Sequence, residues 1–136
     1  MFSEWKFVFN SISGNWKDAS FDDSQWNTVT LGNVEIPVTG PQFFRKSFTS
    51  ITGIAAYELS LYYRFGIVAY VNGEEVYRDN MPNGEIIPTT AATGSYQISN
   101  YHSVIRPGSE VGNTNAVLAV EIHFVTLPQT FVDFDA

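Results

Sequence analysis

The two histidines, His102 and His123, are the side chains that could exchange a proton near neutral pH. Neither has a second histidine at the spacing of a metal-ligand pair, so the sequence does not predict a zinc site. His123 alternates with apolar residues, and we expect it to be structural, on a partly exposed face of a sheet. His102 stands beside Tyr101 in the segment Ser99 to Ser103, which we expect to be a loop, and could hydrogen-bond a ligand.

The carboxylates form no pattern that predicts catalysis. A hydrolase needs a nucleophile beside a base, or two carboxylates that face each other across a cleft. Glu74, Glu75 and Glu85 cluster near a predicted turn, and solvating that turn is their ordinary role. The glycines do not form a phosphate-binding loop. We therefore predict no catalytic residues and expect that this chain is not an enzyme.

Asp22, Asp23 and Ser24 are residues that cap a helical turn, because their side-chain oxygens accept the first free N–H groups. An alternative makes the two aspartates calcium ligands. Two adjacent carboxylates without further spaced oxygen ligands fall short of a calcium loop. We predict no metal-binding residues and no cofactor, and a structural calcium ion remains an open alternative.

Polar and aromatic side chains in predicted loops are the candidates for binding a ligand. A sugar offers a CH-rich face that stacks on a ring and hydroxyls that pair with polar groups. Arg78, Asp79 and Asn80 follow a predicted hairpin, while Tyr101 and His102 supply a ring and an imidazole. We predict these five as ligand-binding residues. Alternatively, the tyrosines complete the rim of the core and the polar cluster solvates a loop.

A β-hairpin in the middle of the chain is the clearest structural signal. Apolar and polar residues alternate from Tyr57 to Arg64, the pattern of a strand with one buried face. Ile67 to Val71 then meets Asn72-Gly73, a dipeptide typical of a type I′ turn, and returns as Glu74 to Tyr77. Ala116 to Phe124 repeats the alternation, with Glu121 and His123 on its polar face.

The rest of the chain reads as further strands joined by loops. Strands are predicted at Trp5 to Phe9, Phe43 to Phe48, Tyr96 to Ile105 and Phe131 to Phe134. Connections are predicted at Leu31 to Pro41, Arg78 to Gly94 and Arg106 to Asn115. This gives eight or nine strands with almost no helix. The pattern predicts an all-β sandwich of two antiparallel sheets.

The chain length of 136 residues fits one domain, which we place at 1–136. The net charge of −7 opposes binding to nucleic acid and to anionic membranes. No apolar run is long enough to insert into a membrane as a spanning helix. The absence of cysteine excludes disulfides and leaves the redox compartment open. The start of the chain does not read as a signal peptide, and we expect that it was cut from a longer protein.

Four motifs that occur in order resemble those of one family. The chain is similar to galactose-binding-domain-like jelly-roll modules, in the form of the sugar-binding domain of family 2 glycoside hydrolases and of accessory modules of secreted bacterial enzymes. The motifs are Trp16-x4-Phe21-Asp22-Asp23-Ser24-x-Trp26, Phe44-Arg45-Lys46-x-Phe48, Val71-Asn72-Gly73-x-Glu75-Val76 and Asn115-x-Val117-Leu118-Ala119-Val120-Glu121-x-His123. Arg45 is expected to stack on an aromatic ring or to pair with the aspartate-rich segment.

The resemblance implies a jelly-roll β-sandwich that binds carbohydrate through loops, next to other domains of an extracellular or cell-surface protein. Two departures matter. Arg64-Phe65-Gly66 stands where relatives commonly read Asp-Asp-Gly, and Gln129-Thr130-Phe131 where they often read Ser-Ser-Asp. The leading hypothesis is therefore a non-catalytic carbohydrate-binding or accessory module of a larger protein. The alternative is a structural or protein-interaction domain that packs against a neighbouring catalytic domain.

Overall fold

The computed structural model describes residues 3–31, 40–112 and 115–125, and within them the chain is built from strands. Their bounds are β1 Ser3–Phe9, β2 Asn27–Leu31, β3 Gln42–Thr49, β4 Ala56–Tyr63, β5 Gly66–Val71, β6 Glu74–Asp79, β7 Asn100–Pro107 and β8 Asn115–His123, with one short 3-10 helix, η1, at Gly108–Val111. The predicted strand at Phe131 to Phe134 and most of the predicted connection Leu31 to Pro41 lie outside the described residues.

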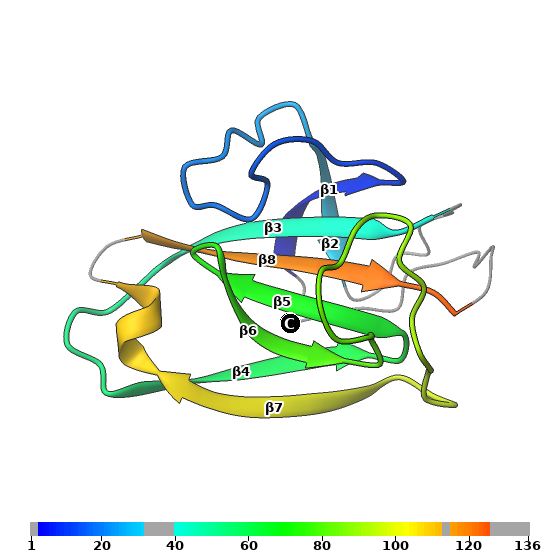
Figure 1. The fold of residues 1–136 in the computed structure, drawn as a ribbon. Helices are drawn as coiled ribbons and strands as arrows, with labels where there is room; N and C mark the ends of the chain where they lie inside the picture. The colour runs from blue at the N-terminus through cyan, green and yellow to red at the C-terminus, as the bar shows by residue number, and fades with distance from the viewer. Residues whose placement is uncertain (1–2, 32–39, 113–114, 126–136) are drawn as a thin grey trace.

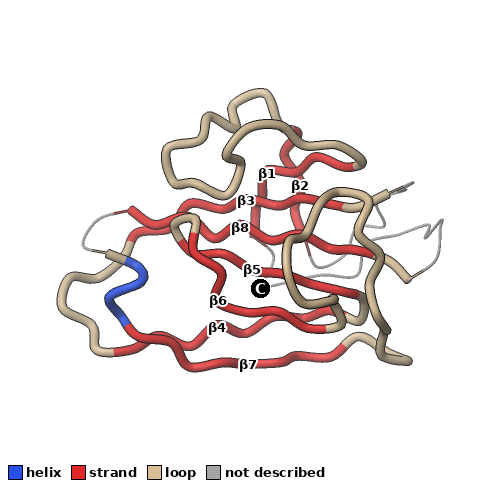
Figure 2. The backbone as a smooth tube through the Cα atoms, in the orientation of Figure 1, coloured by secondary structure: helices blue, strands red, loops and turns tan. Residues whose placement is uncertain are grey.

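The strands form two antiparallel sheets that face each other (Figures 1 and 2). The larger sheet has six strands in the order β2-β1-β3-β8-β5-β6, and the smaller pairs β4 with β7. Strand β8 lies between β3 and β5, so residues far apart in sequence become neighbours at the centre of the larger sheet. The predicted all-β sandwich of two antiparallel sheets is confirmed.

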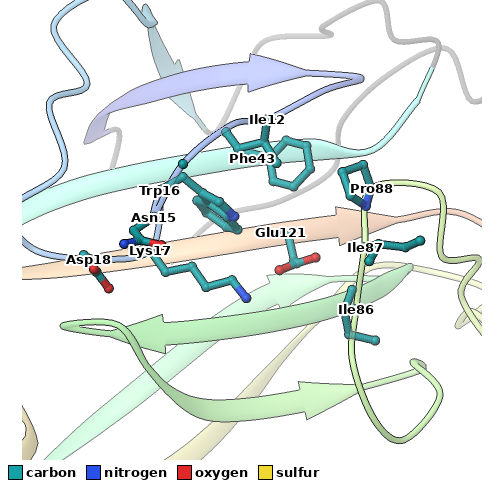
Figure 3. A pocket seen from close by; sticks show the side chains of 11 residues that line it. Ile12, Asn15, Trp16, Lys17, Asp18, Phe43, Ile86, Ile87, Pro88 and Glu121 are labelled. Atoms are coloured by element: carbon teal, nitrogen blue, oxygen red, sulfur yellow. The ribbon is translucent and has the colours of Figure 1, made fainter.

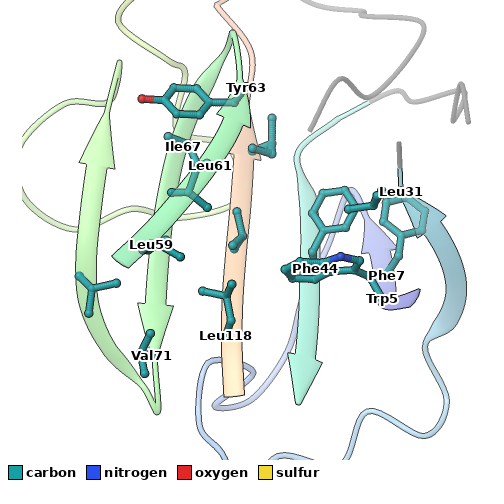
Figure 4. Packing of buried hydrophobic residues seen from close by; sticks show 14 of the residues in the cluster. Trp5, Phe7, Leu31, Phe44, Leu59, Leu61, Tyr63, Ile67, Val71 and Leu118 are labelled. Carbon is teal, nitrogen blue, oxygen red and sulfur yellow. The ribbon is translucent and has the colours of Figure 1, made fainter. Parts of the chain in front are cut away.

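The main core lies between the two sheets (Figure 4). On β4, Leu59, Leu61 and Tyr63 are buried while the residues between them are more exposed, as the alternation predicts. Apolar side chains of β3, β5 and β8 meet them from the larger sheet, among them Phe44, Ile67, Val71, Leu118 and Val120. Burial of these side chains is the dominant stabilising term of the sandwich.

The turn between β5 and β6 has the predicted conformation. Asn72 has φ 50° and Gly73 has φ 87°, the two positive values that a type I′ turn needs. The Asn72 side chain also accepts a hydrogen bond from the Val117 amide at 3.0 Å and donates one to the Glu110 carbonyl at 3.1 Å. This hairpin is therefore tied to β8 and to η1.

Two loop segments cover the other face of the six-stranded sheet and form a second core. Trp16 packs there with Phe43 and Tyr70, and Met81 and Ala92 arrive from the segment after β6. This cover explains why the prediction for His123 is wrong in one respect. Its side chain is only 1% exposed, because the Thr90 carbonyl lies over it at 2.7 Å from Nδ1.

Arg45 anchors the first of these segments, as the sequence predicted. Its Nε donates to the Asp23 carboxylate at 2.9 Å, and its guanidinium lies 5.2 Å from the centre of the Phe21 ring. It also donates to the backbone carbonyls of Trp16 and Asp18. Because the group is buried, these bonds fix the path of the segment.

The aspartate-rich segment contains no helical turn. The Trp26 amide donates to the Asp23 carbonyl at 3.0 Å, which closes a single turn before β2 begins. Asp22 accepts a hydrogen bond from the Ser24 amide at 3.0 Å, the interaction expected of a capping side chain. That bond lowers the pKa of the Asp22 carboxyl. The residues therefore cap a turn, as short polar side chains do, and the strand starts too soon for a helix.

Two predicted loop boundaries are wrong. Arg78 and Asp79 are the last residues of β6, so the irregular segment starts at Asn80. Tyr101 and His102 lie on β7, which pairs with β4 along its whole length. The strand predicted at Tyr96 to Ile105 contains both residues but starts four residues too early. Its inward face carries the polar His102 and Arg106 beside Val104, and its outward face carries Tyr101 and Ile105, so the period-2 signal was weak there.

Candidate functional site

A cavity of about 240 Å³ opens on the loop-covered face of the six-stranded sheet (Figure 3). One wall comes from the segment between β1 and β2, through Ile12, Trp16 and Lys17, and the opposite wall from Ile86, Ile87 and Pro88. Phe43 of β3 and Glu121 of β8 lie at its base. The cavity is therefore built from four parts of the chain that only the fold brings together.

The first wall is held by aromatic packing and by Arg45. The Trp16 indole meets the Phe43 ring edge-on at 5.1 Å and the Tyr70 ring at 5.8 Å between centroids. The Trp16 carbonyl accepts from the Arg45 guanidinium. Both the ring and the backbone of Trp16 are thus fixed. The residue, whose ring also stacks on Trp26, is 5% exposed and contributes a small, preorganised apolar surface to the cavity.

The second wall is held by Arg78. Its guanidinium donates to the Pro82 carbonyl at 2.6 Å and the Gly84 carbonyl at 2.9 Å, and pairs with Glu75 at 2.6 Å. A further turn closes between the Thr90 amide and the Ile87 carbonyl at 2.9 Å. Arg78 therefore supports the loop that lines the cavity and does not itself line it.

Glu121 places a buried carboxylate at the base of the cavity. The side chain is 2% exposed, its Oε2 accepts from the Tyr70 hydroxyl at 2.8 Å, and its Oε1 lies 2.6 Å from His123 Nε2. A carboxylate has about four lone-pair positions. Two are used by these partners, so the group keeps acceptor capacity for a molecule in the cavity.

The Glu121–His123 pair shares one proton. The Thr90 carbonyl can only accept, so His123 Nδ1 carries a hydrogen and donates it. At 2.6 Å, Nε2 and Oε1 also need a proton between them, held either by an imidazolium or by a carboxyl group. In both arrangements the pair as a whole is neutral. This explains how a carboxylate and an imidazole can both be buried.

Lys17 brings a cation to the rim. Its Nζ lies 4.2 Å from the centre of the Tyr70 ring and 5.9 Å from that of the Trp16 ring. Such contacts attract an ammonium group to the faces of the rings. Asp18, the next residue, contributes an anion to the same lining. The cavity thus combines a hydrogen-bond acceptor at its base, a donor at its rim and an aromatic wall.

The structure places the five ligand-binding residues predicted from sequence in four different settings. Arg78 supports the loop of the cavity wall, as described above. Asp79 and His102 come together in a cluster at one end of the sandwich, where the Asp79 carboxylate accepts from the Tyr63 hydroxyl at 2.5 Å and the Tyr96 hydroxyl at 2.7 Å. The His102 ring packs against both tyrosines, 4.7 and 4.8 Å from their centroids, and the two tyrosine rings lie 6.1 Å from each other. This cluster joins the two sheets.

The remaining two predicted residues lie elsewhere. Asn80 has φ 55° and donates to the Phe65 carbonyl at 3.4 Å, so it shapes the start of the loop after β6. Tyr101 is 55% exposed on the outer face of β7 and packs against Tyr62 at 5.0 Å. The five residues therefore do not assemble into one site.

The cavity residues were not predicted as ligand-binding residues. Glu121 was predicted on the polar face of a strand, and Trp16 was noted only as part of a motif. One signal could have drawn attention to them: a carboxylate and an imidazole two positions apart on a strand that is otherwise apolar from Ala116 to Phe124. On a sheet covered on both faces, such polar groups must find partners.

Within residues 3–31, 40–112 and 115–125, no group of three or more histidine, aspartate or glutamate side chains is arranged to hold a metal ion. In the same part of the chain, no helix has the length and apolar character needed to cross a membrane.

Comparisons with known proteins show the fold. No protein-family model and no curated protein sequence matches this chain. Among solved structures, β-glucuronidase 2 of Bacteroides uniformis is similar over 98% of this chain and 17% of its own, with a TM-score of 0.60 and 18% identity. A β-glycosidase from Bacteroides vulgatus is similar over 89% of this chain and 16% of its own, with a TM-score of 0.58 and 15% identity.

A β-glucuronidase from glycoside hydrolase family 2 is also similar, over 88% of this chain and 13% of its own, with a TM-score of 0.55 and 14% identity. The resemblance predicted from the sequence, to the galactose-binding-domain-like jelly roll of family 2 glycoside hydrolases, is thus confirmed for the fold. The chain spans 13–17% of the length of these enzymes, so it corresponds to one part of each.

Proposed function

We propose that this chain is a non-catalytic carbohydrate-binding module of a larger extracellular or cell-surface protein of the glycoside hydrolase type. We place its sugar site in the cavity above Glu121. The fold supports the first part, since the similar structures are β-glycosidases and β-glucuronidases of which this fold makes up a small share. Function does not follow from fold alone, so the proposed sugar site must be supported by the residues of the cavity itself.

The observation that carries the site is the Glu121 carboxylate, which is buried, held from two sides and still able to accept hydrogen bonds from the cavity. Sugar hydroxyls are donors that fit such an acceptor. The Trp16 indole beside it offers an aromatic surface for the CH groups of a sugar ring. Lys17 at the rim can donate to a hydroxyl oxygen. Together these groups offer hydrogen-bond partners for sugar hydroxyls and an apolar contact for the sugar ring.

A glycan array followed by calorimetry on this chain tests the proposal. The sharpest variant is Glu121→Gln, because an amide can keep its oxygen on the Tyr70 hydroxyl and donate its NH₂ to Nε2 of neutral His123. The fold should therefore survive while one acceptor of the cavity is lost. Any glycan that binds the wild type should bind this variant about tenfold more weakly.

Two matched controls accompany that variant. Lys17→Met should also weaken binding, whereas Lys46→Met should not, since Lys46 Nζ lies over Trp5, a residue of the core on the opposite face of the sheet. Tyr101→Ala should leave binding unchanged if the cavity is the site. An array without any signal would contradict the proposal. A signal that only Tyr101→Ala removes would move the sugar site to β7.

A second candidate function is supported by the outer face of the two-stranded sheet. Tyr101 is 55% exposed and Ile105 is 67% exposed on β7, and Tyr62 packs beside Tyr101. Large exposed apolar groups that lie together are typical of a protein contact surface. This face would pack against a neighbouring domain of the parent protein. Co-purification of this chain with the rest of that protein, lost in a Tyr101→Asp, Ile105→Asp variant, would support it.

A further inference from the structure

The lining of the cavity carries no surplus of positive charge. Lys17 contributes one cation and Asp18 one anion, and the Glu121–His123 pair is neutral as a unit. The whole chain has a net charge of −7, so its field also disfavours an anion. The formal charges of the lining therefore sum to zero, so a negatively charged ligand gains no net attraction from it.

The positions of the polar groups set the kind of ligand group that fits. At the base, the remaining capacity of Glu121 is for accepting hydrogen bonds, so the deepest group of a ligand must be a donor. At the rim, the Lys17 ammonium is a donor and needs an acceptor. A hydroxyl can serve in either role, whereas a carboxylate only accepts. A ligand carboxylate at the base would place an acceptor against the Glu121 acceptor, and neither group would have a hydrogen-bond donor.

The size of the cavity limits how much of a glycan enters. At about 240 Å³ it lies below the roughly 300–1,000 Å³ of sites that enclose drug-sized ligands. The two walls, around Trp16 and around Ile87, close it on opposite sides (Figure 3). This space suits one sugar ring, at the end of a chain or on a side branch, and does not suit a run of several rings.

We infer that the cavity above Glu121 takes a single neutral hexose unit and discriminates against uronic acids. This inference rests on the proposed carbohydrate-binding function. The class of sugar follows from the positions of the hydrogen-bond donor and acceptor in the cavity and from the summed charge of its lining. At the base of the cavity Glu121 accepts a hydrogen bond from a sugar hydroxyl. Trp16 contacts the sugar ring, and Lys17 donates to a sugar oxygen at the rim.

Matched pairs of small ligands test it. The methyl glycosides of glucose, galactose and mannose are each compared with the methyl glycoside of the corresponding uronic acid, which differs only by a carboxylate in place of CH₂OH. Binding is measured by calorimetry and by tryptophan fluorescence on the wild type and on Glu121→Gln. We expect at least one neutral member to bind at least tenfold more tightly than its uronic acid, and Glu121→Gln to weaken that binding about tenfold.

The possible results distinguish the neutral-hexose specificity from the proposed carbohydrate-binding function. A uronic acid that binds as tightly as its neutral partner, with binding lost in Glu121→Gln, would keep the sugar site and overturn the neutral-hexose specificity. Binding that Glu121→Gln leaves intact would place the sugar outside the cavity and overturn the inference while the module still binds carbohydrate. If none of the six glycosides binds, the inference is overturned, and the array decides whether the carbohydrate function falls with it.

Discussion

The hydroxyl of Tyr70 donates to the carboxylate of Glu121 at 2.8 Å, although Tyr70 lies on β5 and Glu121 on β8. The two strands are neighbours in the larger sheet, and both side chains point to its loop-covered face, where His123 holds the other carboxylate oxygen. A carboxylate held in this way cannot turn away from the cavity. Its remaining acceptor positions therefore have a fixed direction, which is what a binding site needs.

Replacing Tyr70 by Phe removes one of the two donors to a buried carboxylate. Because hydrogen bonds to charged groups contribute about 1.5–3 kcal/mol, we expect the free energy of unfolding to fall by that amount. Urea denaturation followed by tryptophan fluorescence measures it. Tyr62→Phe, on the outer face of β4, is the control and should change stability by less than about 0.5 kcal/mol. Equal effects of the two variants would contradict the role of the Tyr70 hydroxyl.

Replacing Arg45 by Lys should be strongly destabilising although the charge is kept. The planar guanidinium serves Asp23 and the carbonyls of Trp16 and Asp18 at once, and a single ammonium group cannot reach all three. We expect a loss of about 3 kcal/mol or more, measured by denaturant unfolding. The neighbouring substitution Lys46→Arg should cost less than about 0.5 kcal/mol. An Arg45→Lys protein as stable as the wild type would show that the fork geometry is not needed.

The tyrosines predict how stability depends on alkaline pH. The hydrogen bond from Tyr96 to Asp79 raises the pKa of Tyr96 to about 12, and burial raises the pKa of Tyr63 and Tyr70. A phenol with a raised pKa in the folded state binds its proton more tightly there than in the unfolded state. Its contribution to stability is complete below about pH 10, the pKa of an unperturbed tyrosine, and is lost as the pH rises through the folded pKa.

Spectrophotometric titration of tyrosinate in the folded protein checks this prediction. These tyrosines should remain protonated at pH 10, and unfolding should become easier between about pH 10 and pH 12. In Asp79→Asn the acceptor charge is removed, so the pKa of Tyr96 should fall towards its ordinary value. If the titration curves of the two proteins coincide, Asp79 does not set the pKa of Tyr96.

A chelator should leave the melting temperature unchanged. Asp23 is engaged by Arg45 and Asp22 by the Ser24 amide, so the two aspartates proposed as alternative calcium ligands already have partners in the protein. Thermal unfolding with and without an excess of chelator, and with added calcium, measures the effect. A drop of several degrees on chelation that calcium reverses would establish a structural ion.

Much of the fold could be predicted from the sequence because its signals are local. The alternation in β4 and β8 and the Asn72-Gly73 turn identify a sandwich without any knowledge of the pairing of the strands. Strand β7 was only partly predicted. Of its inward side chains only Val104 is apolar, while His102 and Arg106 are polar and the outward Tyr101 and Ile105 are exposed, so hydrophobicity did not mark its buried face.

The candidate site could not be predicted because it depends on which loops cover the sheet. Glu121 reads as a solvent-facing residue in sequence, and it is buried only because the segments around Trp16 and Thr90 fold over β8. Arg78 was predicted in the loop after the hairpin but lies on β6, and its guanidinium donates to the Pro82 and Gly84 carbonyls of the loop that follows. Such long-range contacts leave no periodic signal along the chain.

Binding of sugar in the cavity beside Trp16 can be followed through the indole N–H resonances of the three tryptophans. Trp16 lines the cavity, whereas Trp5 is buried in the core on the opposite face of the sheet. Substitution of each tryptophan by Phe assigns the three signals. Addition of a binding neutral methyl glycoside should shift the Trp16 signal and leave the Trp5 signal in place. A sugar that binds without moving the Trp16 signal would show that the sugar site lies outside this cavity.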